Sequence, residues 1–362
     1  MMNSDLLLKQ LLKASTTVDI DGLLTKLPIV DHEQYHVDYG NKIIGNWRED
    51  HLHWLPIGGD RGNGGRIKLA GKPTNPIAER LVNGMEALIE LFRLLELAAN
   101  PDAPMPKTPR EAVMRYFGLP RLDSLPHVGN KVERVRLQEI INKIRKMLYA
   151  QLMYSSSAKE FAVSVRDSGM GQEPGRIHKT LLSLGQTDKA DKPYMIGVFG
   201  QGGSSAFAAS KYSIVLSRRA KDIVGPSGDD GVGWTIIQQI FPKGRRDNYF
   251  AYLAAAPSGE VPRIDTTAAN SAGFNGGSQF VHIGYDFGGT SSAVARTLYQ
   301  ALNHVLFSPM LPYDLFVLDK ERPEQMLGTA QRLALRAVRM AKDRSIGRQS
   351  VLDKSFAPQP VG

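Results

Sequence analysis

The stretch that organises this chain runs from residue 165 to residue 207 and reads VRDSGMGQEPGRIHKTLLSLGQTDKADKPYMIGVFGQGGSSAF. It opens with an Asp-x-Gly-x-Gly turn formed by Asp167, Gly169 and Gly171. Apolar residues alternate just before Asp167, which predicts a strand over 160–167 that ends at this carboxylate. An ionised carboxylate only accepts hydrogen bonds, and the glycines let a flat ring approach the backbone. The turn therefore suits a ring that carries an exocyclic amine, although a plain structural turn is the alternative.

A second glycine-rich turn closes the stretch, over residues 197–205. Successive backbone N–H groups with little side-chain bulk bind phosphate, especially when they lead into a helix. The segment that follows, from residue 206, is compatible with a helix. Taken alone, this turn is also a weak indication of function.

Upstream of both turns, Asn75-Pro76 predicts the start of a helix, with Asn75 as the N-cap. Its expected buried face carries Ile77, Leu81, Leu88, Phe92 and Leu95. Another face carries Glu79, Asn83, Glu86 and Glu90. An Asn oxygen suits Mg²⁺, and a Glu one turn away can deprotonate an attacking water. The alternative is an ordinary solvated face.

The order of these motifs resembles the GHKL superfamily of gyrases, heat-shock chaperones, histidine kinases and MutL-type ATPases, and in its lid the chaperone and MutL/MORC members. The chain follows the sequence ExxxN, DxGxG, GxFGxGGSS and then Gly276-Gly277-Ser278. The resemblance covers residues 71–320. It implies a Bergerat-type nucleotide site, an ATPase activity and Mg²⁺ as cofactor.

The resemblance implies a role for each matching residue. Glu79 would be the catalytic base, and Asn83 would hold the Mg²⁺. The residues assigned to ATP binding are Asn83, Asp167, Gly169, Gly171, Thr187, Gly197, Phe199, Gly200, Gln201, Gly202, Gly203, Ser204 and Ser278. The segment that ends in the glycine-rich turn would form a mobile lid. ATP would close this lid and drive homodimerisation as a conformational switch.

The chain departs from the superfamily pattern in several places. Glu86 stands where an Asp is usual, and Ser278 replaces a Thr. The segment between the first two motifs is long, so residues 100–155 are expected to form an inserted helical region. No His-box helix is evident, which counts against a histidine kinase. The distal Lys or Arg that reaches the terminal phosphate is not assigned.

The fold expected from these patterns is an α+β two-layer sandwich, with a mixed, mostly antiparallel sheet and helices on one face. Strands are predicted at 160–167, 211–217, 233–241, 249–255, 279–285 and 313–319. Helices are predicted at 4–14, 109–117, 131–153, 291–307 and 323–344, besides the one that starts at Asn75. The expected organisation is an N-terminal helix and irregular arm (1–70), an ATP-binding domain (71–320), and a basic helix and tail leading to a further domain (321–362).

Composition sets outer bounds on function. The 362 residues are 42% hydrophobic, carry a net charge of +9 and include no cysteine. Disulfides and thiolate metal sites are thereby excluded, and a reducing, cytoplasmic location fits. No signal peptide and no membrane span are expected, so no membrane partner is predicted.

Several alternatives stay open at this stage. The chain could be a nucleotide-gated clamp or scaffold for nucleic acid or protein with little turnover, or a chaperone-like protein. Basic helices at 131–146 and 332–344 favour a nucleic-acid partner, and the alternative is arginines left in water. The GGDRGNGG run at 58–65 fails the P-loop pattern and is expected to be a flexible loop. His51 and His53 are a metal-binding pair only if a third ligand exists.

Overall fold

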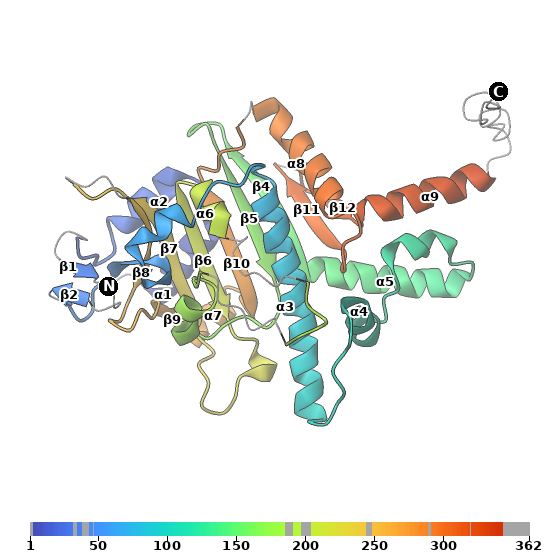
Figure 1. Ribbon diagram of the computed structural model, residues 1–362, viewed down its shortest axis with the longest axis horizontal. Helices are drawn as coiled ribbons and strands as arrows, with labels where there is room; N and C mark the ends of the chain where they lie inside the picture. The colour runs from blue at the N-terminus through green and yellow to red at the C-terminus, as the bar shows by residue number, and fades with distance from the viewer. Residues whose placement is uncertain are drawn as a thin grey trace.

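A mixed, mostly antiparallel sheet forms the centre of the fold in the computed structural model (Figure 1). The structure describes residues 3–31, 35–37, 43–45, 47–184, 191–196, 204–243, 248–288, 291–318 and 320–342. Its strands are β1 (Tyr35–Val37), β2 (Ile43–Gly45), β3 (His53–Pro56), β4 (Leu148–Ser155), β5 (Glu160–Asp167), β6 (Tyr212–Arg218), β7 (Val232–Ile240), β8 (Tyr249–Ala254), β9 (Arg263–Ile264), β10 (Gly277–Ile283), β11 (Tyr313–Val317) and β12 (Glu324–Met326).

The main sheet has ten strands in the order β12-β11-β4-β5-β10-β6-β7-β8-β3, with β9 added beside β7. Strand β11 pairs with β4 in parallel, and the other pairings of this sheet within the described residues are antiparallel. The α+β class and the mostly antiparallel sheet are thereby confirmed.

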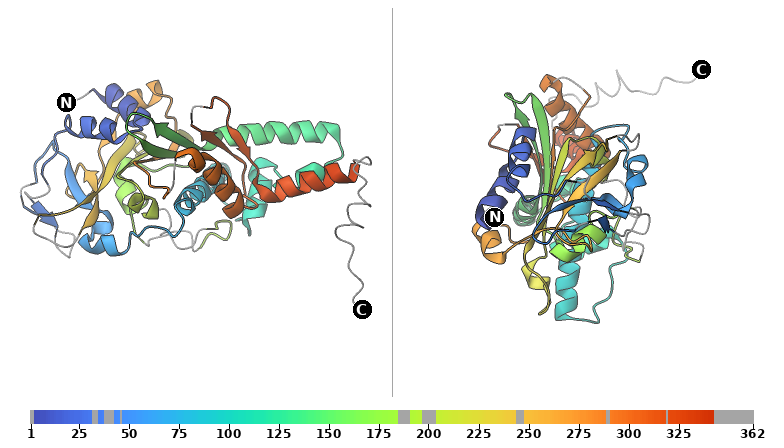
Figure 2. Two further views of the ribbon diagram at one scale, coloured as in Figure 1. Left: turned by 90° about the horizontal axis from the view of Figure 1, so that it is seen from above. Right: turned by 90° about the vertical axis from the view of Figure 1, so that its left-hand side faces the viewer.

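The helices cover both faces of the sheet. They are α1 (Ser4–Lys13), α2 (Thr17–Leu24), α3 (Asn75–Ala99), α4 (Pro109–Phe117), α5 (Lys131–Met147), α6 (Ser205–Ala208), α7 (Thr266–Ser271), α8 (Ser291–Val305) and α9 (Gly328–Lys342). Helices α3, α5 and α8 pack with Val163 and Val165 of β5, whereas α1, α2 and α7 pack with Ile214 of β6 and Ile283 of β10 (Figure 2). The expectation of helices on one face is therefore wrong. The central strands are apolar on both sides, so each side needs a cover.

Helix α3 begins one residue earlier than predicted from the capping pattern. Thr74 is its N-cap and makes no side-chain capping bond, so Asn75 is already helical. Ile77, Leu81 and Leu88 are fully buried in the core beneath it. This packing holds α3 across the sheet, and the contacts with β4, β5 and α6 follow from that position.

The helix predicted over 131–153 ends early. Helix α5 stops at Met147, and β4 starts at Leu148 with no connecting turn. Leu148 fits both a helical and a strand pattern. It continues the apolar stripe of Ile144 on the helix, and it also begins a buried alternation with Ala150 and Leu152. The sheet decides between them, since β4 pairs along its whole length with β5.

The N-terminal region is also more regular than expected. Strand β3 pairs with β8 at the edge of the main sheet, so residues 53–56 belong to it. The glycine-rich run at 58–65 forms two short 3₁₀ turns, and Asn63 is buried there. Its side chain donates to the Ile57 and Phe250 carbonyls and accepts from the Phe250 N–H. The run therefore braces β8 and is not a flexible loop.

The inserted region and the last helix form a projecting arm. Helices α5 and α9 run next to one another away from the sheet in both views (Figures 1 and 2). Helix α9 packs on α8 and on η4, a 3₁₀ turn at Leu122–His127. The predicted helix at 323–344 is in fact β12 followed by α9. Within the described residues, no helix is both long and apolar enough to cross a membrane.

Candidate functional site

The candidate site lies where α3 crosses the end of β5. Gly84 of α3 faces Asp167, and a Cβ built on Gly84 would lie 3.3 Å from the Asp167 Cβ and 2.6 Å from Leu148 Cδ1. A larger residue would push α3 away from the sheet. The structure therefore brings the Glu79–Asn83 helix directly against the Asp-x-Gly-x-Gly turn, although the two are far apart in sequence.

The turn after Asp167 is fitted to α3 by its glycines. The Gly169 N–H donates to the Asp167 carboxylate at 2.9 Å, and the Met170 N–H donates to the Ala87 carbonyl at 3.0 Å. A Cβ on Gly169 would lie 2.6 Å from Ala87. Gly171 has φ 57°, and a Cβ there would collide with the Arg218 carbonyl. Both glycines are thus required by close backbone approach and, at Gly171, by a left-handed conformation.

Asp167 belongs to a polar row that crosses three neighbouring strands. It stands opposite Ser278 of β10, which in turn stands opposite Ser217 of β6. The two serine hydroxyls are 2.8 Å apart, and Ser217 Oγ also accepts from the Gln172 N–H at 2.9 Å. The sequence argument named Asp167 and Ser278 but missed Ser217. Only the strand register reveals that residue, because its local sequence reads as an ordinary strand.

Burial dominates the electrostatics of this row. Asp167 is 6% exposed, and burial raises its pKa to about 7. Hydrogen bonds from the backbone N–H groups of Gly169 and Ser278 act in the opposite direction, as does the charge of Arg166. The carboxyl group is therefore poised to change protonation near neutral pH.

The predicted catalytic base and the predicted Mg²⁺ ligand lie one turn apart on α3. Glu79 is exposed, and Asn83 is half-buried, closer to the Gly84–Asp167 contact. Desolvation raises the pKa of Glu79, and the adjacent charge of Arg80 opposes that shift. A raised pKa makes this carboxylate a better proton acceptor.

The same helix face continues into two buried carboxylates. Glu86 accepts a hydrogen bond from the Ile196 N–H at 2.6 Å. Glu90 accepts from the Tyr194 hydroxyl at 2.7 Å and pairs with Lys192 Nζ at 2.8 Å. Glu86 and Glu90 are 1% and 6% exposed, so this part of the face is not solvated. It fastens residues 192–196, just before the glycine-rich turn, to α3.

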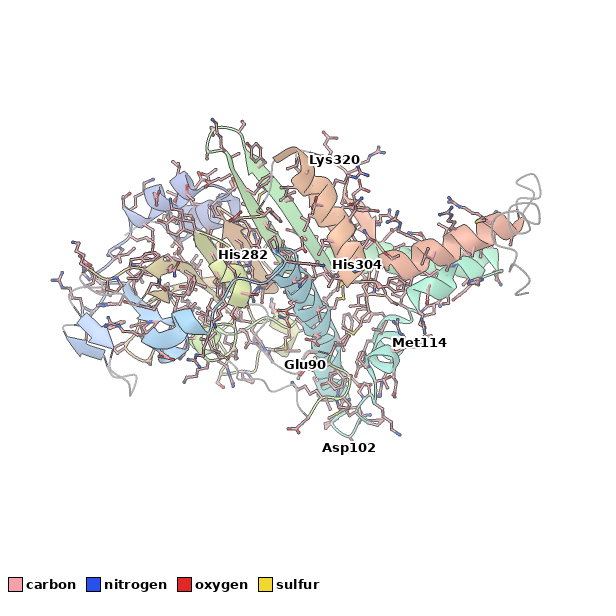
Figure 3. All side chains as sticks on the ribbon, turned by 45° about the horizontal axis from the view of Figure 1, so that its top comes forward. Glu90, Asp102, Met114, His282, His304 and Lys320 are labelled. Carbon is pink, nitrogen blue, oxygen red and sulfur yellow. The ribbon has the colours of Figure 1, made fainter. Side chains whose placement is uncertain are left out.

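Arg80 is a buried cation next to the catalytic candidate. Its guanidinium lies 3.9 Å from the centre of the Phe280 ring and 5.2 Å from that of Phe207 on α6. Burial lowers its pKa to about 10, so it stays charged at neutral pH. The same burial, assisted by the charge of Arg80, lowers the pKa of His282 on β10. Figure 3 shows His282 on the sheet beside α3, and Glu90 further along the helix.

The remaining assigned residues belong to the segment that was predicted to form a lid. Ser204 is half-buried and precedes α6 as its N-cap. Thr187, Gly197, Phe199, Gly200, Gln201, Gly202 and Gly203 lie outside the described residues. Of the predicted site, the structure therefore brings together Asn83, Asp167, Gly169, Gly171 and Ser278.

A metal site built by protein side chains alone is not found among the residues with described positions, where no three His, Asp or Glu side chains cluster. His53 stacks on Trp47 at 3.7 Å, and His51 Nδ1 lies 3.0 Å from the Glu49 carbonyl. These two histidines thus serve local structure. The Asn83 amide oxygen has the donor chemistry for an Mg²⁺ ion that takes its other ligands from phosphates and water.

No known family model matches this chain, and no curated protein matches it either.

Proposed function

We propose that this chain binds ATP together with Mg²⁺ and hydrolyses it in a Bergerat-type site. The observation that carries the proposal is the contact of the Asp-x-Gly-x-Gly turn with α3 at Gly84 and Ala87. This contact places the acceptor Asp167 next to the helix that carries Asn83 and Glu79. The motif order that resembles the GHKL superfamily supports the same assignment.

In this proposal the adenine ring lies against the polar row. Ionised Asp167 accepts from the exocyclic amine, and Ser278 and Ser217 provide hydroxyls beside it. Gly169 and Gly171 hold the turn against α3 and β6, which fixes the position of the Asp167 carboxylate. ATP should therefore be preferred over GTP, which offers a carbonyl oxygen where ATP offers an amine.

The phosphates extend along α3 toward its N-terminal turns. Asn83 would hold a Mg²⁺ ion through its amide oxygen, and the ion would neutralise charge on the phosphates. Glu79, one turn further along, is exposed and has a raised pKa, which suits a general base for the attacking water. The buried charge of Arg80 adds a positive field on the same side of the helix.

Lid closure follows from the contacts of residues 192–196. Glu86 and Glu90 hold this segment on the helix that also carries the catalytic pair. A nucleotide that contacts α3 and the glycine-rich turn would therefore contact both the helix that holds residues 192–196 and the turn that follows them. We infer that ATP closes the lid and promotes a homodimer.

The test is calorimetric binding of a non-hydrolysable ATP analogue, with and without Mg²⁺, to the parent and to Asp167→Asn. Loss of a hydrogen bond to a charged group costs about 1.5–3 kcal/mol, so the variant should bind about 10- to 100-fold more weakly. Asp286→Asn is the matched control, because the exposed Asp286 accepts the Gly288 N–H at 2.7 Å in a similar turn. If the parent binds no ATP, or if Asp167→Asn binds it equally well, the assignment is wrong.

A second candidate function is a nucleotide-gated clamp with little turnover. The exposed position of Glu79 favours this second function, because a site open to solvent does not keep bulk water away from the reacting groups. The two candidates differ in one measurement. An enzyme releases phosphate steadily under saturating ATP, whereas a clamp binds ATP and forms the dimer without such release.

A further inference from the structure

Helix α9 carries positive charge alone and presents it to solvent. Its sequence, GTAQRLALRAVRMAK, contains no Asp or Glu. Arg332, Arg336 and Arg339 stand at i, i+4 and i+7, and all three are exposed. They span about 10 Å along the helix axis at 1.5 Å per residue. We propose that this stripe binds the phosphate backbone of a nucleic-acid duplex without reading its sequence.

The pairing of the other arginines in this region supports the proposal. Arg93 and Arg115 both bond Glu96, and Arg145 bonds Asp314 where α5 meets β11. Arg136 and Arg121 have acid partners in Glu133 and Asp123, respectively. Each of these five arginines has a carboxylate partner.

The stripe on α9 has no such partners among the residues that the structure describes. Arg336 and Arg339 form no ion pair there, and Arg332 lies 5.7 Å from the centre of the Tyr299 ring, a neutral contact. Three neighbouring cations without counter-charges repel one another modestly. A polyanion that spans them would remove that repulsion.

The start of α9 is fixed to the body, so the stripe has a defined direction. The Thr329 hydroxyl donates to the Asn303 carbonyl at 2.8 Å, and the Ala330 N–H donates to the Phe307 carbonyl at 2.9 Å. Further along, α9 packs on η4. The arginines thus stand on an anchored helix that projects beyond the sheet (Figures 1 and 2).

Helix α5 adds charge to the same arm. Lys131, Arg134, Lys143 and Lys146 are exposed on it and form no ion pair with any described residue. Glu139 is also exposed on α5 and forms no ion pair with a described residue. The arm as a whole is therefore strongly basic, with α9 as its purely cationic element.

A duplex fits this surface better than a membrane does. A helix that lies on lipid needs a free apolar face to insert, together with its basic face. On α9, Leu335 and Val338 are half-buried, and Leu333 is the apolar side chain that is more than half exposed. One exposed leucine gives little apolar area, whereas phosphates require only the cations.

The test is binding of a fluorescent 20-base-pair duplex of mixed sequence between 50 and 200 mM salt, by anisotropy. The variant is Arg332→Glu with Arg336→Glu and Arg339→Glu. Each lost phosphate contact should lower the log–log salt slope by about 0.9, so three contacts correspond to roughly 40-fold in affinity across this range. We expect the parent to show that additional salt dependence and the variant to lose it.

The control reverses the same number of charges elsewhere. Lys9, Lys13 and Lys26 are exposed on and beside α1 and α2, which cover the sheet face opposite α3. Replacement of these three lysines by Glu should leave the salt slope equal to that of the parent. Thermal melting will show that both triple variants are folded. Equal slopes for both triple variants would mean that overall charge alone acts, and would overturn the proposal. Failure of the parent to bind duplex DNA or RNA, or binding only to anionic vesicles, would also overturn it.

Discussion

Replacing Asp167 by asparagine should make the folded protein more stable at alkaline pH, even though it damages the candidate site. Burial raises the pKa of Asp167 from its ordinary value of 3.8 to about 7 in the folded state. Between these two values the folded protein keeps a proton that the unfolded chain has released. The associated stability is therefore fully present below pH 4 and is lost as the pH rises through 7.

The magnitude follows from the size of that shift. Each pH unit between the two pKa values removes about 1.4 kcal/mol of stability. Of the three pH units between pH 5 and pH 8, about two lie below the folded-state pKa of Asp167. The parent should therefore lose roughly 2.5 kcal/mol of unfolding free energy through this one group. Asparagine has the same shape, does not ionise, and can still accept the Gly169 N–H through its oxygen. The variant should lack this loss.

The assay is urea unfolding of the parent and of Asp167→Asn at pH 5, 6, 7 and 8 without nucleotide. We expect the unfolding free energy of the variant, relative to that of the parent, to increase by roughly 2.5 kcal/mol as the pH rises from 5 to 8. Asp286→Asn, at an exposed carboxylate in a similar turn, should show a much smaller change. A difference between parent and Asp167→Asn that stays constant from pH 5 to pH 8 would refute the reasoning.

Four further outcomes concern the nucleotide. Glu79→Ala should lose about 10²–10⁴-fold in turnover while binding ATP normally, as measured by phosphate release and calorimetry. Asn83→Ala should abolish the gain in ATP affinity that Mg²⁺ gives, in the same titration with and without the metal. Gly169→Val should lower the melting temperature by several degrees and weaken ATP binding, because the new Cβ overlaps Ala87. The parent should bind ATP about tenfold more tightly at pH 8 than at pH 6, a dependence absent from Asp167→Asn, because ionised Asp167 is the acceptor.

Local patterns predicted the strands well where the chain alternates or runs apolar between turn residues. The predicted strand over 160–167 is β5, with the same bounds. The strands predicted at 211–217, 233–241, 249–255, 279–285 and 313–319 correspond to β6, β7, β8, β10 and β11, with bounds that differ by up to two residues. Strands β6, β8 and β10 are buried at every position, as expected of short apolar runs bounded by turn residues. The resemblance to the GHKL superfamily implied one site that includes both Asp167 and the helix of Glu79 and Asn83, and the structure brings the two together.

The failures share a physical cause, which is tertiary competition for an ambiguous segment. Residues 148–153 continue the helical stripe of α5, and only pairing with β5 makes them a strand. The role of Ser217 depends on register across β10, which no local pattern contains. Glu86 and Glu90 read as a solvated face, yet their partners lie more than 100 residues away at Ile196 and Tyr194.

The junction between α5 and β4 has a mechanical consequence. The carbonyl of Met147, the last residue of α5, accepts the N–H of Ser168 at 2.8 Å, and Leu148 stands opposite Asp167. The arm is thus joined to the sheet at Leu148, the residue opposite the candidate adenine acceptor Asp167. If a duplex on the arm changes the affinity for ATP by some factor, ATP must change the affinity for the duplex by the same factor. Measuring either titration in the presence of the other ligand would give one coupling free energy.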